Sequence, residues 1–97
     1  MQFSIPADHP CLPGHFPGRP LVPGVVVLDA VLQALAERGV AVGALRLPQV
    51  KFLQPLLPEQ VAEVVLAGDP EGPWRFEVQS QGRLIASGRL ERAGAAP

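Results

Sequence analysis

The distribution of apolar and polar residues divides the chain into one helical segment and several segments typical of strands. Between Val25 and Ala36 only Asp29 and Gln33 are polar, and the run is too long for an ordinary strand. Pro23-Gly24 precedes the run and Gly39 follows it, which is the usual arrangement of a helix start and a helix stop. A helix that is apolar nearly all round is typical of the protein interior, so we expect this helix to be buried on all sides.

The remaining apolar residues follow the period of two that is typical of strands, with glycine-containing turns between the runs. Residues 6–24 differ because six of the twelve prolines lie there, and they predict an ordered loop. Since short turns join the later runs, we expect four of the strands to form an antiparallel meander. The predicted strands are Gln2–Ile5, Leu45–Leu53 with a break at Pro48, Val61–Leu66, Trp74–Val78 and Leu84–Leu90.

One helix combined with short strands indicates an α+β protein. A single chain can bury its helix on all sides only if the sheet curls around it, so we expect a curved antiparallel sheet wrapped around one long helix. The 97 residues predict a single domain, residues 1–97, in which residues 92–97 form a flexible tail. Because so small a domain is marginally stable alone, association with a second copy would stabilise it.

Composition and charge exclude several classes of function. The net charge of −1 argues against nucleic acid as a partner. No apolar run reaches the ~20 residues of a membrane-spanning helix, and the first residues show no secretory signal, so we expect a cytoplasmic protein without membrane contact. The single cysteine, Cys11, excludes an internal disulfide. Neither His9 nor His15 has further ligands at a metal-binding spacing, so no metal or cofactor is expected.

Asp29 is the first candidate for chemistry, because a carboxylate in an apolar helix is costly to bury without a partner or a purpose. Burial in an apolar environment makes a carboxyl group a better proton donor near neutral pH. Gln33 lies one helical turn further along the same face and can hold the carboxyl group through a hydrogen bond. The alternative is that the two side chains only satisfy each other.

His15 is the natural base, since a free imidazole titrates at ~6.5 and can accept a proton at neutral pH. It stands in the stiff segment Gly14-His15-Phe16-Pro17-Gly18. Gly24 follows nine residues later and offers a backbone N–H at a helix N-terminus, which can polarise a carbonyl oxygen as an oxyanion hole does. The alternatives are a loop histidine bonded to a carbonyl and a glycine that only begins a helix. His9 is a poorer candidate because Asp8 and Pro10 on either side of it are typical of an exposed turn, and Cys11 is poorer because the sequence identifies no base for it.

The run GHFPGRPLVPGVVVLDAVLQA resembles the central motif of the 3-hydroxyacyl-acyl-carrier-protein dehydratases of fatty-acid synthesis. In that family a GHFPxxPxxPG segment leads into the helix, an acid follows the histidine by fourteen residues, and a glutamine follows the acid by four. The same spacings hold here at His15, Asp29 and Gln33. The resemblance extends loosely over residues 6–91, although Pro58-Glu59 stands where the family usually has Pro-Gly-Asp. The short form is similar to the dehydratase-like proteins of bacterial aryl-polyene and related pigment clusters.

The resemblance implies a hotdog fold and a dimer whose two sheets join, with two sites at the interface. It implies dehydration of a 3-hydroxyacyl thioester, carried by acyl carrier protein, to the trans-2-enoyl thioester. His15 of one subunit would remove the α-proton, Asp29 of the other would protonate the leaving hydroxyl, and the Gly24 N–H would bind the thioester oxygen. The other implied residues are Gln33, Phe16 and Pro17 in support, Val25, Leu28 and Leu32 along an acyl tunnel, and Arg19 and Lys51 at the carrier protein.

Two other classes of function remain open at this point. A hotdog thioesterase shares the fold and often a helix acid, but it hydrolyses the thioester and usually lacks the His-Phe-Pro-Gly loop. A non-catalytic subunit would bind the acyl carrier or pair with another dehydratase, and a larger or mixed oligomer is the alternative to a homodimer. Such a subunit needs neither His15 nor Asp29, so the presence of both residues favours dehydration.

Overall fold

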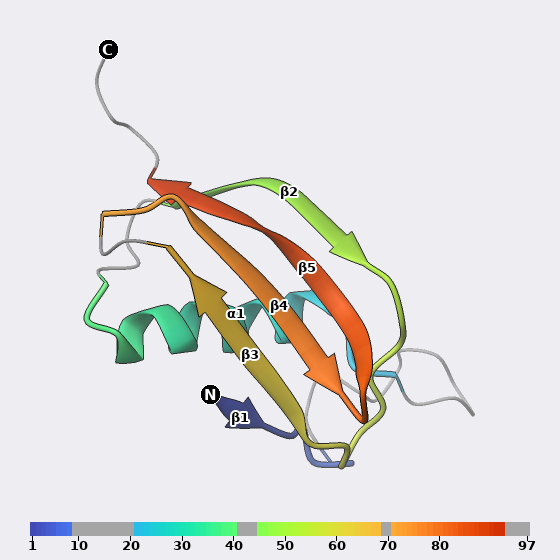
Figure 1. Cartoon of the computed structure of the whole chain (residues 1–97). Coiled ribbons are helices and arrows are strands. Elements are labelled where there is room, and N and C mark those ends of the chain that lie inside the picture. Colours follow the sequence, from blue (N-terminus) through green and yellow to red (C-terminus); the bar gives the residue numbers. More distant parts are fainter. Residues whose placement is uncertain (9–20, 41–44, 69–70, 93–97) are drawn as a thin grey trace.

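The computed structural model describes residues 1–8, 21–40, 45–68 and 71–92, and these form one helix and five strands (Figure 1). The positions agree with the predicted segments to within a few residues, and the helix ends where Gly39 predicts. The elements are β1 Gln2–Phe3, α1 Gly24–Glu37, β2 Leu45–Phe52, β3 Ala62–Ala67, β4 Trp74–Ser80 and β5 Arg83–Arg92.

The five strands form one antiparallel sheet in the order β1-β3-β4-β5-β2, and α1 crosses one face of it (Figure 1). The predicted α+β fold with a single helix is confirmed. The predicted four-stranded meander is wrong, because β2 pairs with β5 at the sheet edge and not with β3. The backbone N–H groups of Leu53 and Gln54 both donate to the Ile85 carbonyl, so the chain leaves β2 alongside β5 before it reaches β3. Alternation along a strand indicates which face is buried, but it does not indicate the neighbouring strand.

The helix buries one stripe of side chains against the sheet and leaves the opposite stripe exposed. The buried residues are Val27, Ala30, Val31, Ala34 and Leu35. The expectation that the helix is buried on all sides is therefore wrong for the single chain, since Val25 is 71 % exposed and Asp29 and Gln33 are exposed as well. The sheet of one chain covers only one side of the helix.

The helix ends in a left-handed glycine. Gly39 has φ 85°, its N–H donates to Ala36 O at 2.9 Å, and the Val40 N–H donates to Leu35 O at 3.1 Å. These two bonds form a Schellman motif, and Val40, the residue that follows the glycine, is buried.

The core lies between α1 and the inner face of the sheet. In β4 the inward side chains Trp74, Phe76 and Val78 are buried, whereas the residues between them are exposed, as strand alternation requires. At the end of β5 the Arg92 guanidinium lies 5.4 Å from the centre of the Trp74 ring. Arg92 is the last residue of β5, and the rest of the predicted tail, residues 93–97, lies outside the described residues.

None of the helices in the described ranges combines the length and the apolar character needed to cross a membrane.

The corner between β2 and β3 contains a residue in a strained backbone conformation. Glu59 has φ 71°, the left-handed region that favours glycine, and it stands where the related motif has glycine. Its backbone N–H donates to Ile5 O at 2.8 Å, and its carboxylate accepts a 2.7 Å bond from the Ala7 N–H. The side chain therefore ties the N-terminal segment to the corner, and this bond offsets the unfavourable backbone angle.

We expect Glu59→Ala to lower the free energy of unfolding by about 1 kcal/mol, because it removes the bond to Ala7 and retains the strain. Glu59→Gly removes the bond to Ala7 and also the backbone strain. The free energy of unfolding of this variant should therefore lie within about 0.5 kcal/mol of the wild-type value, after the greater unfolded-state entropy of glycine is included. Urea denaturation measures both values, with Glu63→Ala, an exposed glutamate on β3, as the control. Equal losses for the alanine and glycine variants would show that position 59 is not strained.

Candidate active site

The first turn of α1 presents backbone N–H groups without a side-chain cap. Pro23 occupies the N-cap position and cannot cap the turn, and there is no acidic residue in the first turn. The N–H groups of Val26 and Val27 donate to Pro23 O at 3.0 and 3.3 Å, whereas no described residue accepts a bond from the Gly24 N–H. This N–H is therefore available to an acceptor such as a carbonyl oxygen, and the helix dipole favours negative charge at that position.

Phe52, at the end of β2, lies directly against Gly24. A Cβ atom built on Gly24 would stand 2.8 Å from Phe52 Cζ, so any larger residue at 24 would displace the ring. A cavity of about 420 Å³ opens beside this contact, and its lining includes Gly24, Val27, Phe52 and Leu53. Its volume is within the usual range of ligand pockets. Glycine at position 24 therefore allows both the aromatic ring and a ligand to approach the helix N-terminus.

Asp29 and Gln33 form the pair that their spacing predicts. Gln33 Nε2 donates to Asp29 Oδ2 at 2.9 Å, on the exposed stripe of α1 that also carries Val25. The hydrogen bond leaves the other carboxylate oxygen of Asp29 without a partner among the described residues. The carboxylate is thus oriented but open to the surroundings.

Gly24 and Asp29 lie on different sides of the helix. Five residues separate them, which corresponds to a rise of about 7.5 Å and a rotation of about 140°. Gly24 faces Phe52 and the cavity beside it, whereas Asp29 faces away from the sheet. Within one chain the acid and the open N–H therefore do not converge on one point.

The other predicted site residues fall into three groups. Lys51 lies exposed on β2, and on the helix Leu28 and Leu32 are half-buried. The predicted tunnel residues Val25, Leu28 and Leu32 do not line the cavity at Gly24, so the tunnel stays a prediction. The candidates that lie outside the described residues are His15, Phe16, Pro17 and Arg19, together with His9 and Cys11.

Sequence reasoning missed Phe52 and Val27 as walls of the cavity at Gly24. Both are apolar residues in apolar segments, so the sequence pattern predicts core positions for them. The only signal was the glycine itself, since glycine at a helix start allows close approach of another group. The sequence did not indicate which strand end would lie against it.

Comparison with known proteins identifies relatives of this chain. The profile of the ApeI-like family, described as ApeI dehydratase, matches residues 1–89. The 3-hydroxyacyl-[acyl-carrier-protein] dehydratase FabZ of Haemophilus influenzae (strain ATCC 51907) is 31 % identical over an alignment of 70 residues that covers 63 % of this chain and 47 % of that protein. FabZ of Bradyrhizobium sp. (strain BTAi1) is 33 % identical over 97 residues, covering 86 % of this chain and 64 % of its own length. The chain spans about half to two thirds of the length of these relatives.

A solved structure has a similar fold. A chain of the dehydratase heterocomplex ApeI:P from Xenorhabdus doucetiae superposes with a TM-score of 0.76 at 25 % sequence identity, covering 93 % of this chain and 81 % of that one. The match extends over the sheet and helix, and it confirms the predicted hotdog fold.

We expect Asp29→Asn and Gln33→Ala each to change the free energy of unfolding by less than about 0.5 kcal/mol, because an exposed pair one turn apart contributes little. Val31→Ala, on the buried side of the same helix, should cost about 2 kcal/mol. Urea denaturation at one fixed protein concentration compares the three variants. A loss at Asp29 as large as that at Val31 would show that the carboxylate serves folding.

Proposed function

The chain belongs to the ApeI-like dehydratase family, and from this premise we propose that it dehydrates a 3-hydroxyacyl thioester carried by acyl carrier protein. The product is the trans-2-enoyl thioester. The observation that carries the proposal is the arrangement on α1: an open N–H beside a ligand-sized cavity, and a carboxylate oriented by Gln33 on the other side of the same helix. The FabZ relatives support this substrate class, since their names specify it.

The roles follow from the chemistry of elimination. The thioester oxygen accepts a hydrogen bond from the Gly24 N–H, which stabilises negative charge as the α-proton leaves. His15, supported by Phe16 and Pro17, accepts that proton. The bond between the β-carbon and the hydroxyl oxygen then breaks, and Asp29 donates a proton so that water departs. The histidine therefore needs to reach the α-carbon and the acid needs to reach the β-hydroxyl.

We propose that the acid of each site comes from a second copy of the chain. The rotation of about 140° between Gly24 and Asp29 directs the carboxylate away from its own chain's cavity. A partner covering the exposed stripe of α1 would receive Asp29 and would bury Val25. The ApeI:P structure is a heterocomplex of dehydratases, so a mixed pair is the competing arrangement.

The β2 edge is the second surface that supports association. Among the described strands, β2 has a hydrogen-bonded neighbour only on the β5 side. Leu47 is 41 %, Phe52 53 % and Leu53 49 % exposed, which is unusual for large apolar residues along a free strand edge. Joining two such edges would extend the sheet and cover these side chains. Because Phe52 also lies against Gly24, the same association would complete the wall of the cavity.

The acyl chain and its carrier occupy the remaining predicted positions. We place the acyl chain along Val25, Leu28 and Leu32, which border the exposed stripe of α1 and would line a tunnel once a partner covers it. Carrier proteins are acidic in the related systems, and we assign their contact to Arg19 and Lys51. Lys51 borders a hollow on the outer face of the sheet with Arg75 and Arg89, so several cations are available there.

We expect His15→Ala and Asp29→Asn each to lower turnover at least ~10²-fold, because each removes a general acid or base. Enoyl absorbance follows the reaction on a 3-hydroxyacyl-carrier substrate, and thiol release is recorded in parallel. Gel filtration of each variant controls for assembly. Activity within threefold of the wild type in both variants would contradict the assignment, and thiol release without enoyl formation would identify a thioesterase.

Mixing the two inactive variants tests whether the site is shared between chains. In a mixed dimer one site carries both substitutions and the other carries neither, so random reassociation should restore about one quarter of wild-type activity. The variants are unfolded together in urea, refolded as a mixture and assayed beside each variant refolded alone. A mixture no more active than its components would show that His15 and Asp29 act within one chain.

A further inference from the structure

A second and larger cavity adjoins the one at Gly24. Its volume is about 680 Å³, and the two share four lining residues, Leu21, Gln54, Pro55 and Ile85. The larger cavity ends at the turn between β4 and β5, where Arg83 contributes to the wall. The two adjoining cavities define a path, as the term is used below, that extends from the helix N-terminus to a cation at the end of the sheet.

We propose that this path binds the phosphopantetheine arm of the substrate and that Arg83 binds its phosphate. The inference rests on the proposed function, because it takes the thioester end of the arm to lie at the Gly24 N–H. The same arm occurs in acyl carrier protein and in coenzyme A. The inference thus assigns a substrate-binding role to Arg83 on β5, which lies far in sequence from the motif around His15.

The length of the path fits the arm. Phe52, which covers Gly24, pairs with Ala86 in the sheet, and Arg83 lies three residues earlier on β5, a distance of about 10 Å along the strand. Pantetheine is roughly as long as an extended peptide of four residues, on the order of 14 Å. The arm is thus somewhat longer than the distance along the strand, and the flexible Arg83 side chain can extend beyond its own backbone to meet the phosphate.

The chemistry of the walls also fits. Pantetheine alternates amide groups with apolar carbons, and the segment shared by the two cavities offers the apolar side chains of Leu21, Pro55 and Ile85 beside the amide of Gln54. No described residue forms a hydrogen bond with the Gln54 side chain, so its amide is available to a ligand.

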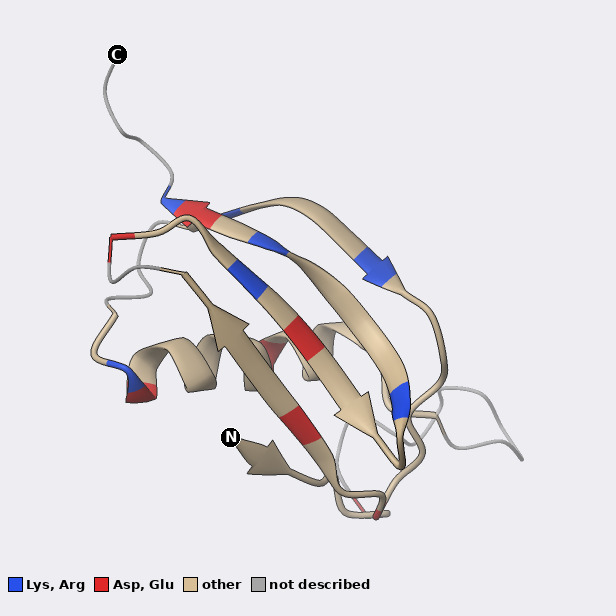
Figure 2. Cartoon of the chain, viewed as in Figure 1, with Lys and Arg blue, Asp and Glu red and all other residues tan. Residues whose placement is uncertain are grey.

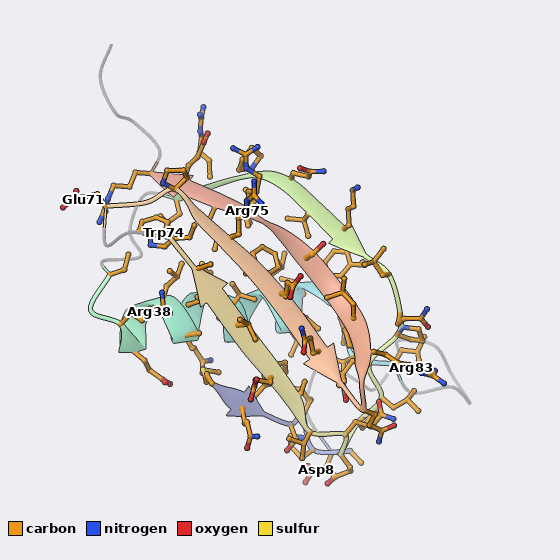
Figure 3. All side chains as sticks on the ribbon, viewed as in Figure 1. Asp8, Arg38, Glu71, Trp74, Arg75 and Arg83 are labelled. Atoms are coloured by element: carbon orange, nitrogen blue, oxygen red, sulfur yellow. The ribbon has the colours of Figure 1, made fainter. Side chains whose placement is uncertain are left out.

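The backbone of Arg83 is held in a defined position, and its side chain carries a charge that no described residue pairs with. It follows the two-residue turn Gln81-Gly82, whose φ angles of 53° and 74° are those of a tight hairpin turn, and it pairs with Ser80. Among the described residues it forms no salt bridge. Figure 3 shows Arg83 at the end of the sheet opposite Trp74 and Arg75, and Figure 2 shows the basic segment at the start of β5 apart from the charged residues at the other end.

One carboxylate, Glu59, also lines the larger cavity. Its Oε1 atom accepts the bond from the Ala7 N–H, so part of its charge is already neutralised by a donor. Arginine binds phosphate through two parallel N–H bonds, and such a charge-assisted pair outweighs one partly satisfied carboxylate nearby.

The test compares 3-hydroxyacyl thioesters of phosphopantetheine and of pantetheine, which differ only in the phosphate. Arg83→Ala should raise KM about tenfold for the phosphorylated substrate, leave kcat unchanged, and leave both constants unchanged for pantetheine. Arg38→Ala, an exposed arginine at the C-terminal end of α1, should change neither. Thioesters of carrier protein and of coenzyme A form the second arm, and the KM increase is expected for both because both contain the phosphate.

Calorimetry of phosphopantetheine binding separates this inference from the proposed reaction. Binding that weakens about tenfold in Arg83→Ala supports the phosphate site even if the chain does not turn over a 3-hydroxyacyl thioester. Equal losses on the phosphorylated and unphosphorylated substrates would show that Arg83 serves only the fold. Turnover that is unaffected by Arg83→Ala on all four substrates would overturn the inference and leave the dehydratase activity standing.

Discussion

The contact between the start of the helix and the end of β2 determines where the candidate site lies. The Phe52 ring lies against the Gly24 Cα, and the Val22 N–H donates to Leu56 O at 2.9 Å just before the helix begins. The Ile85 carbonyl accepts bonds from Leu53 and Gln54 and thereby fixes the same corner to β5. Because these contacts join three elements, they place the open helix N-terminus, the cavity beside it and the path toward Arg83 at one end of the sheet.

The sequence was sufficient for the features that depend on neighbours along the chain. The helix bounds follow from Pro23-Gly24 and Gly39, and the Asp29–Gln33 bond follows from a spacing of four. The apolar alternation of Trp74–Val78 also predicted the strand that became β4. These features are local, since a turn, a cap or a helical face is determined by residues within a few positions of one another.

The sequence did not predict the features that depend on contacts between segments far apart along the chain. The position of β2 beside β5 and the Phe52 ring at Gly24 result from how elements meet in space. The error about Asp29 has the same origin. An apolar helix predicts cover on all sides, but its pattern does not say whether one chain or two provide that cover. The prediction assigned that cover to the sheet of the same chain, and it was wrong because this sheet leaves the stripe of Val25 and Asp29 exposed.

This exposed stripe links the stability of the protein to its chemistry. A strongly exposed valine beside a carboxylate on a short helix is unfavourable in an isolated chain, and the free edge of β2 adds further apolar surface. A second chain over both surfaces would remove the apolar residues from water and would bring a foreign carboxylate toward each cavity. In such an arrangement, association and catalysis require the same contacts. Substitutions at Val25 would then affect turnover through assembly even though the side chain takes no part in proton transfer.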